Sequence, residues 1–449
     1  MKYAFLLLFF LLTLTVQAQN QKGGDDAKGI FKYENFQKHD ECGSSCHVDF
    51  YAQWKQMMMS KCYTHEWDEI EYFKLAVPHA EKDSKVAGVK AGCNGCHAPA
   101  SFMSGDVPPP KPNFNSRANE SVSCDICHTV TGIAGDTPFN FNFISNPGNV
   151  KYGNRDDSES PAHETAKNPL LSKAEFCGAC HNEKSPYGAW VKATHLEWKE
   201  GPYSKEGVQC QNCHMPRTPG VTSAMGTPRQ DAAQHLFHGA HDPGKVRGTV
   251  ELRIHPETQE VAPGEQTKFT VILFNQKTGH KFPTGSAEER MLWLHVTATD
   301  SKGKTYHLKV DRKGFEGEDY TIASNVFAYQ DMGVPLGIPG FAGIQRDGIP
   351  EGDRIFRMPY LDSQGRMTIQ QWNTASFGPD YRLGPREAKS ETFTWILPDD
   401  VELGELTIKA VLNYQKLPTP VAEYLGVPKE EAEIIEVNFH QTYLTVVDD

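Results

Sequence analysis

Cysteine is missing from the whole second half of this 449-residue sequence, in which the last cysteine is Cys213. Any cofactor that the chain attaches through thiols must therefore be held by the first half. Long apolar runs are also missing after Val16, although a membrane-spanning helix needs about 20 apolar residues. No membrane span is expected beyond the N-terminal segment.

Positive charge is in deficit. Lysine and arginine number 45 against 57 aspartate and glutamate, which gives a formal net charge of −12. Proteins that bind nucleic acid usually present a basic face. This balance therefore argues against a nucleic-acid partner.

The first residues have the pattern of an export signal. Lys2 precedes an apolar run from Ala4 to Val16, and Val16-Gln17-Ala18 fits a small-residue cleavage site. We expect a cleavable signal peptide over residues 1–18 and a mature protein that begins near Gln19. The expected localisation is periplasmic or extracellular.

Cysteine is plentiful in the first half, and most of it follows one spacing. The pattern Cys-x-x-Cys-His is the attachment signature of c-type haem, because two thiols add to the haem vinyl groups and the adjacent imidazole reaches the iron. The pattern predicts four covalent haems with proximal histidine ligands. The four signatures are Cys93, Cys96 and His97; Cys124, Cys127 and His128; Cys177, Cys180 and His181; and Cys210, Cys213 and His214.

A looser signature precedes these four. Cys42 and Cys46 are separated by three residues instead of two, and His47 follows directly. We expect a fifth haem here, with His47 as its proximal ligand and the extra residue bulging out of the attachment loop. The alternative is a local disulfide beside a surface histidine.

Other uses of paired cysteines fit less well. Zinc pairs do not require a histidine after every second cysteine, and a redox dithiol normally occurs once. Ten of the eleven cysteines are used by the signatures, which leaves Cys62. We interpret Cys62 as a buried free thiol, with an intermolecular disulfide as the alternative.

Each iron also has a second axial position, for which several histidines are available. The segment around Thr64-His65 repeats around Thr194-His195, and this duplication favours His65 and His195 as distal ligands. His235 and His241 come from a histidine-rich octapeptide, and His280 from a loop rich in glycine and proline. For each of them, an ordinary surface or loop histidine is the alternative.

The character of the sequence changes near residue 247. Residues 19–246 show no long periodic helix and predict a multihaem domain of short helices and loops. Residues 247–449 show alternating strand patterns, beginning with Val250, Leu252 and Ile254, and predict a β-sandwich-like domain. The expected fold class is α+β.

Taken together, these motifs resemble exported multihaem c-type cytochromes of the cytochrome c-554 family with an appended C-terminal β domain. The resemblance rests on the four signatures, on the unit from Tyr51 and Trp54 to His65, and on Cys213-His214-Met215-Pro216. The stretch from Gly279 to Gly285 is similar to a motif of the appended domain. The resemblance implies closely packed haem pairs, mostly bis-histidine iron and an electron-carrying role.

Three functions are compatible with these features. An electron carrier is favoured, because the supply of histidines is sufficient to cap every iron on both sides. Its partners would be redox proteins, such as another cytochrome or a quinol-linked membrane complex. A multihaem oxidoreductase acting on a small nitrogen or sulfur compound is the less favoured alternative, since no lysine-terminated haem signature occurs. The third is a homo-oligomeric or filament-forming extracellular cytochrome.

Overall fold

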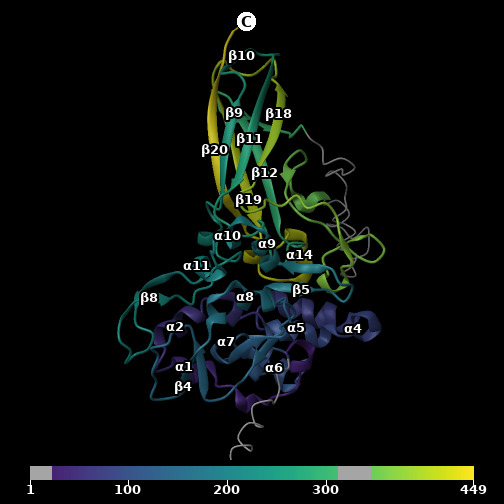
Figure 1. Ribbon diagram of the computed structural model, residues 1–449. Coiled ribbons are helices and arrows are strands. Elements are labelled where there is room, and N and C mark those ends of the chain that lie inside the picture. The colour runs from purple at the N-terminus through teal and green to yellow at the C-terminus, as the bar shows by residue number, and fades with distance from the viewer. Residues whose placement is uncertain (1–22, 312–344, 449) are drawn as a thin grey trace, which may run out of the picture.

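The structure is a computed structural model, which describes residues 23–311 and 345–448. The expected signal peptide over residues 1–18 lies outside these residues. The described chain has two parts (Figure 1): a rounded region of short helices, and a tall β region whose far end carries the C-terminus. The expected α+β class is confirmed.

The helices of the first region are short, and four of them end at a signature histidine. A Cys-x-x-Cys-His segment in helical conformation places its thiols three residues apart and its imidazole four residues from the first thiol, all on one side of the helix. Both thiols and the imidazole can then reach one planar cofactor. The four helices are α5 (Val89–His97), α7 (Cys124–His128), α8 (Ala174–His181) and α11 (Cys210–His214).

The looser signature is built differently. Helix α1 (His39–Gly43) ends between its cysteines, and α2 (Val48–Trp54) begins after His47. The His47 amide donates to the Cys42 carbonyl at 3.0 Å, a bond that spans five residues instead of four. This wider turn accommodates the additional residue.

The other helices of this region carry no haem signature, and four small two-stranded sheets connect the helical segments. The remaining helices are α3 (Glu66–Ile70), α4 (Val77–Lys82), α6 (Pro99–Ser104), α9 (Thr194–Glu200), α10 (Pro202–Lys205) and α12 (Pro243–Val246). The sheets pair β1 (Val130–Ile133) with β2 (Phe143–Ser145), β3 (Val150–Gly153) with β4 (Glu164–Lys167), β5 (Asn182–Lys184) with β6 (Trp190–Ala193), and β7 (Arg217–Gly220) with β8 (Arg229–Ala233).

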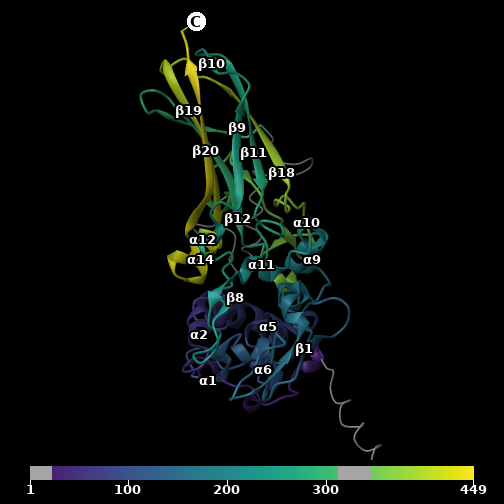
Figure 2. The same ribbon diagram turned by 60° about the vertical axis from the view of Figure 1, so that its left-hand side comes forward.

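The β region contains two larger sheets that share one apolar core (Figure 2). The strands alternate buried and accessible residues, as the sequence pattern predicted, and the inner faces of both sheets contribute to that core. One sheet is β18 (Ala388–Ile396), β11 (Gln266–Asn275) and β9 (Val250–Pro256). The other is β10 (Glu260–Val261), β20 (Ile434–Val446), β19 (Gly404–Gln415), β12 (Met291–Thr299) and β13 (Thr305–Leu308), with β14 (Arg354–Ile355) also paired to β12.

Smaller elements fill the side of the β region that meets the helical region. They are β15 (Tyr360–Leu361), β16 (Met367–Thr368), β17 (Ser376–Phe377) and α14 (Thr419–Leu425). The hydroxyl of Tyr360 donates to the carbonyl of Val191 in β6 at 2.5 Å. The two regions are therefore joined by buried contacts.

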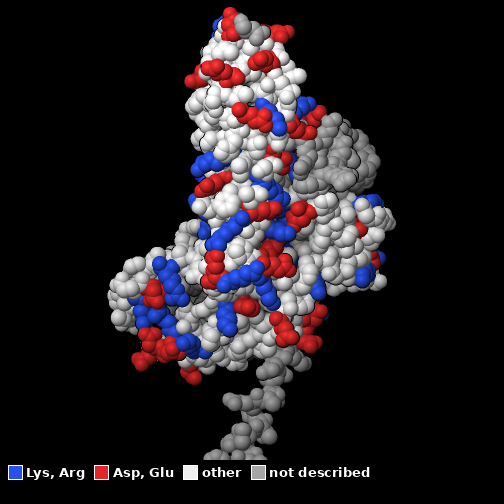
Figure 3. Space-filling view, turned by 45° about the horizontal axis from the view of Figure 1, so that its top comes forward, with Lys and Arg blue, Asp and Glu red and all other residues white. Residues whose placement is uncertain are grey.

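A buried ion pair crosses the same junction. The guanidinium of Arg382 donates to the carboxylate of Glu197 in α9 at 2.8 Å, and the Thr284 hydroxyl donates to the same carboxylate at 2.7 Å. Both charged side chains are less than a tenth exposed. Acidic and basic side chains are interspersed over the outer face shown in Figure 3.

Candidate haem-binding site

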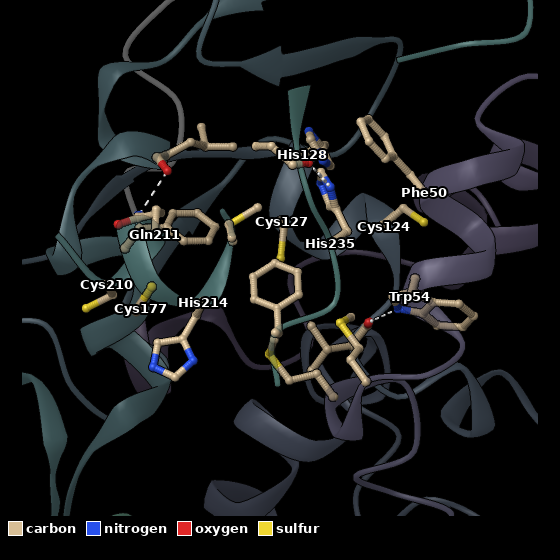
Figure 4. A pocket seen from close by; sticks show the side chains of 18 of the residues that line it. Phe50, Trp54, Cys124, Cys127, His128, Cys177, Cys210, Gln211, His214 and His235 are labelled. Atoms are coloured by element: carbon tan, nitrogen blue, oxygen red, sulfur yellow. Dashed lines mark hydrogen bonds between the residues drawn. The ribbon is translucent and has the colours of Figure 1, made fainter. Parts of the chain in front are cut away.

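The five signatures converge on one cavity of about 1770 Å³. The histidine and at least one cysteine of every signature line it, although these residues are spread over more than 170 positions of the chain. Figure 4 shows part of this lining, with His128 and His214 labelled. Sites for a single small cofactor usually measure about 300–1000 Å³. The cavity therefore has room for more than one cofactor.

Thiols of different signatures lie beside one another in this cavity. The thiols of Cys42 and Cys124 are close enough to interact directly. The same holds for Cys96 with Cys180, and for Cys177 with Cys210. Because each thiol marks the edge of the cofactor that it attaches, these contacts bring neighbouring attachment sites together edge to edge.

Four of the five signature histidines are held in the tautomer that a metal ligand requires. A backbone carbonyl can only accept a hydrogen bond, so an imidazole Nδ1 bonded to one must carry the proton, and Nε2 keeps its lone pair. The acceptors are the carbonyls of Thr222 for His47 (2.6 Å), Cys62 for His97 (2.8 Å), Tyr152 for His128 (2.7 Å) and His238 for His214 (2.8 Å).

Three further histidines show the same arrangement. His163 Nδ1 donates to the carbonyl of Glu164 at 3.0 Å, His235 Nδ1 to that of Ala233 at 2.9 Å, and His280 Nδ1 to that of Lys281 at 2.8 Å. Each therefore also keeps a lone pair on Nε2.

These three histidines stand opposite three signature histidines. The ring centres are 6.3 Å apart for His47 and His163, 6.3 Å for His128 and His235, and 6.4 Å for His214 and His280. The ring planes in these pairs are within 30° of parallel. Because a metal–imidazole bond measures about 2.0–2.1 Å, two imidazoles that ligate one ion from opposite sides have ring centres about 6 Å apart. The residues thus fit bis-histidine iron.

Burial keeps several of these imidazoles neutral. It lowers the pKa of His235 to about 4 and that of His214 to about 4, and it also lowers the pKa of His128 and of His280. A neutral imidazole has the lone pair that a metal needs, whereas imidazolium does not. The site is therefore ready to bind iron at neutral pH.

His65 and His195, the distal ligands predicted from the repeated Thr-His context, have surroundings that differ from each other. Both ring nitrogens of His65 face carboxylates, with Nδ1 2.8 Å from Asp68 and Nε2 3.0 Å from Glu431. Burial alone lowers the pKa of His65, but the two carboxylates outweigh it and raise the pKa to about 9. In this arrangement His65 offers no lone pair.

His195 retains an unpaired nitrogen. It lines the cavity, its Nε2 is buried without a hydrogen-bond partner, and its Nδ1 lies 3.2 Å from the amide nitrogen of Asn182. The ring packs against α8, where a Cβ at Gly178 would come within 2.8 Å of it. A buried ring nitrogen without a hydrogen-bond partner is compatible with a metal ligand.

His241, the remaining candidate, lies at one end of the cavity. Its ring centre is 5.8 Å from that of His65, and its Nε2 is 3.5 Å from Arg290. Burial lowers the pKa of His241 to about 3.

Sequence reasoning did not select His163. It lies beside β4 in a polar segment, and nothing in its neighbourhood distinguishes it from a surface histidine. The parallel pairing of β3 with β4 sets the position of its segment, and its ring centre lies 6.3 Å from that of His47. The sequence offered only the number of irons as a signal, since every iron has a second axial position that a histidine could fill.

Comparison with protein families supports the cofactor assignment. Residues 41–129 match the family described as cytochrome c554 and c-prime, and residues 164–253 match the N-terminal region of the NapC/NirT cytochrome c family. A comparison with curated proteins finds no significant match. The predicted resemblance to multihaem c-type cytochromes is confirmed, and several c-type haems are the cofactors that the signatures attach.

Comparison with solved structures supports the fold. A penta-heme cytochrome c552 from Thermochromatium tepidum is similar over 91% of this chain and 99% of its own, with a TM-score of 0.60 and 19% identity. The CARDB domain of the PF1109 protein from Pyrococcus furiosus covers 44% of this chain and 87% of its own at 12% identity, with a TM-score of only 0.18. The first similarity shows that the two-part architecture exists in a solved multihaem protein.

Among the described residues, no helix combines the length and the apolar character that crossing a membrane requires.

Proposed function

We propose that this protein carries electrons through closely packed, mostly bis-histidine haems in the periplasm or outside the cell. One observation carries the proposal: three signature histidines each face a parallel imidazole at 6.3–6.4 Å, with every Nδ1 proton held by a backbone carbonyl. Haem iron supplies one-electron exchange, and two axial imidazoles leave no position for a substrate.

The order of the thiols supports a continuous route. The contacts of Cys42 with Cys124 and of Cys177 with Cys210 each join two signatures. The Cys127 thiol lies near enough to Cys177 to contribute to the raised pKa of the Cys177 thiol, which connects these two groups. Because Cys180 also contacts Cys96, the haems attached at these thiols would form one connected group rather than isolated centres. Electrons could enter from a redox partner such as another cytochrome or a quinol-linked membrane complex.

The purified holoprotein provides the test. A carrier should show low-spin iron in electron paramagnetic resonance at the three histidine pairs, and it should exchange electrons rapidly with small redox mediators. Reduced protein should not consume hydroxylamine, nitrite or sulfite faster than free haem does. Steady-state turnover well above that of free haem would overturn the carrier assignment.

A specific observation favours an oxidoreductase as the second candidate. In the described part of the chain, no imidazole stacks on His97 or on His181, unlike the other three signature histidines. Basic groups line the same cavity: the ammonium of Lys192, which donates to Glu183 at 2.5 Å, and the guanidinium of Arg290 beside His241. Such groups would attract a small anion.

Acidic groups lie just outside this end of the cavity. Asp68 is 3.7 Å from His97 Nδ1 and 2.8 Å from His65, and Glu288 and Glu289 are fully buried nearby. Burial raises the pKa of Glu288 to about 8. These acidic residues are contributed by segments that are distant from one another in the sequence.

Ligand binding distinguishes the two candidates. An oxidoreductase should contain one high-spin iron that binds cyanide or nitric oxide within the mixing time, and Lys192→Met should reduce turnover of an anionic substrate. Lys184→Met is the matched control, because Lys184 lies outside the cavity lining. If all irons are low-spin and none binds cyanide, the second candidate is excluded.

A further inference from the structure

A second group of potential metal ligands lies outside the haem cavity, on the six-stranded sheet. His295 in β12, His307 in β13 and Asp353 just before β14 bring one ligand atom each within 4.8 Å of one another. None of the three lines the haem cavity.

The strand order explains why these residues meet. One edge of β12 is paired with β19, and the other edge is paired with two short strands in succession. Strand β13 pairs with residues 296–299 of β12, and β14 with residues 293–294. His295 therefore occupies the junction at which one neighbouring strand replaces the other.

The register places both partners beside His295. Thr297 pairs with His307, so His307 is the diagonal neighbour of His295 on the same face of the sheet. Leu294 pairs with Arg354 in the antiparallel direction, so Asp353 comes next to His295 across the β12–β14 edge. Three adjacent strands thus present three side chains at one point.

The distances are those of a compact ligand set. His295 Nδ1 lies 3.0 and 2.9 Å from the two carboxylate oxygens of Asp353, and His307 Nε2 lies 2.7 Å from one of them. The two imidazoles are stacked with ring centres 5.0 Å apart and 18° between their planes. The carboxylate is fully buried, whereas each imidazole is about one-third exposed.

We propose that His295, His307 and Asp353 form a binding site for a divalent transition metal of the zinc class. Two imidazoles and one carboxylate are a ligand set that zinc uses when its fourth position stays open to water or a substrate. The exposed sides of the imidazoles provide the path by which the ion enters. The buried carboxylate supplies the charge, and the strand pairing holds all three groups in place.

The alternative explanation for this arrangement is a hydrogen-bonded cluster, in which Asp353 accepts hydrogen bonds from two imidazoles. That cluster and the metal site use the same three atoms, but they predict different results. A hydrogen-bonded cluster contributes to stability without any metal. A metal site binds zinc in a stoichiometric amount, and zinc raises the thermal stability of the β region.

Zinc binding to the purified holoprotein is the test, and it does not depend on the function of the haems. The protein is first treated with a chelator, then titrated with Zn²⁺ alone by calorimetry, and the bound zinc is counted by mass spectrometry of the metals. We expect one zinc per chain. Because loss of an outer-shell partner alone costs about 10–100-fold in metal affinity, His307→Ala should weaken binding by at least about 100-fold.

Control variants identify the site. His255→Ala removes an exposed histidine from β9 of the other sheet and should leave zinc affinity unchanged. Glu431→Gln alters the histidine and carboxylate group near His65 and should also leave it unchanged. His307→Gln provides a milder change at the same surface position, and its circular dichroism shows whether the domain folds. Equal zinc binding by wild type, His307→Ala and His307→Gln would overturn the proposal.

Discussion

The imidazole of His163 lies nearly parallel to that of His47, with 6.3 Å between ring centres and 29° between planes. The two residues are 116 positions apart in the chain. His47 follows the looser signature, and its Nδ1 donates to Thr222, whereas His163 Nδ1 donates to Glu164. Both Nε2 atoms are thereby free for the same iron.

His163→Ala should therefore remove one axial ligand. We expect one haem to become high-spin or to acquire a foreign ligand, which electron paramagnetic resonance and magnetic circular dichroism would detect. His79→Ala is the control, because its ring accepts a hydrogen bond from Trp372 and faces no signature histidine in the described chain. Identical spectra for wild type and His163→Ala would contradict the pairing.

The number of haems is a second prediction. The wide turn at Cys42 places both thiols of the looser signature on the haem cavity, so we expect five haems per chain. Intact mass and a pyridine haemochrome assay measure this number. Cys46→Ala should lose the mass of one covalent haem, whereas four haems in the wild type would show that Cys42 and Cys46 bind none.

Cys62 should remain a free thiol. Its Sγ donates to the carbonyls of Met59 and His97 at 3.3 Å, and burial raises its pKa far above the ordinary value. Cys62 lines the cavity in which the haems would be attached. The holoprotein should run as a monomer in non-reducing electrophoresis and resist alkylation until it is denatured; a dimer band sensitive to reductant would contradict this.

The junction between the two regions should depend on its buried ion pair. Removing one partner of a buried pair costs about 3–5 kcal/mol when the other charge is left uncompensated. Arg382 keeps Asp380 as a second partner at 2.8 Å, so we expect a cost toward the lower end of this range. Glu197→Gln should therefore lower the melting temperature substantially. Arg386→Gln is the matched control at the same junction, because its pair with Glu206 is exposed and such pairs contribute about 0–1 kcal/mol. Equal effects of the two variants would contradict the assignment.

Stability should fall in acid because of Asp380. Burial raises the pKa of this carboxyl, but Arg382 and Lys281 outweigh burial and lower it from 3.8 to about 2. The ionised carboxylate therefore stabilises the folded state above about pH 4, by about 2 kcal/mol, and this contribution is lost as the pH falls towards 2.

Asp380→Asn should reproduce this loss at neutral pH. Its melting temperature should lie below that of the wild type at pH 7, and the difference should shrink as the pH approaches 2. Asp156→Asn removes an exposed pair with Lys167 and should cause little change at either pH. A difference that stays constant with pH would show that Asp380 acts through packing rather than charge.

The haem signatures could be predicted because attachment chemistry fixes their local spacing. Each Cys-x-x-Cys-His segment contains its whole geometry within five residues, and four of them form helix ends as that spacing requires. Strands whose sequence alternates strictly, such as Val250–Pro256, were also predictable. The pattern of strand β20 is harder to interpret, because its outer face exposes apolar Phe439 and Tyr443 and so blurs the alternation.

Surroundings that come from distant segments could not be predicted. The repeat around His65 records a local sequence, yet Glu431 from the far end of the chain occupies one of its ring nitrogens. His163 carries no local signal, because its position depends on the pairing of β3 with β4. Partner histidines are set by tertiary structure, whereas proximal histidines are set by covalent chemistry.

The placement of His280 opposite His214 has a consequence for biogenesis. His214 and its two thiols lie in the helical region, and under the proposed export they could be loaded with haem as soon as that segment had crossed the membrane. His280 belongs to a loop of the β region, whose sheets include strand β20 from the end of the chain. Under the proposed ligand set, this haem acquires its second imidazole only after strand β20 has been exported and has paired in its sheet. Binding of His280 to this iron would then be a late step in the maturation of the protein.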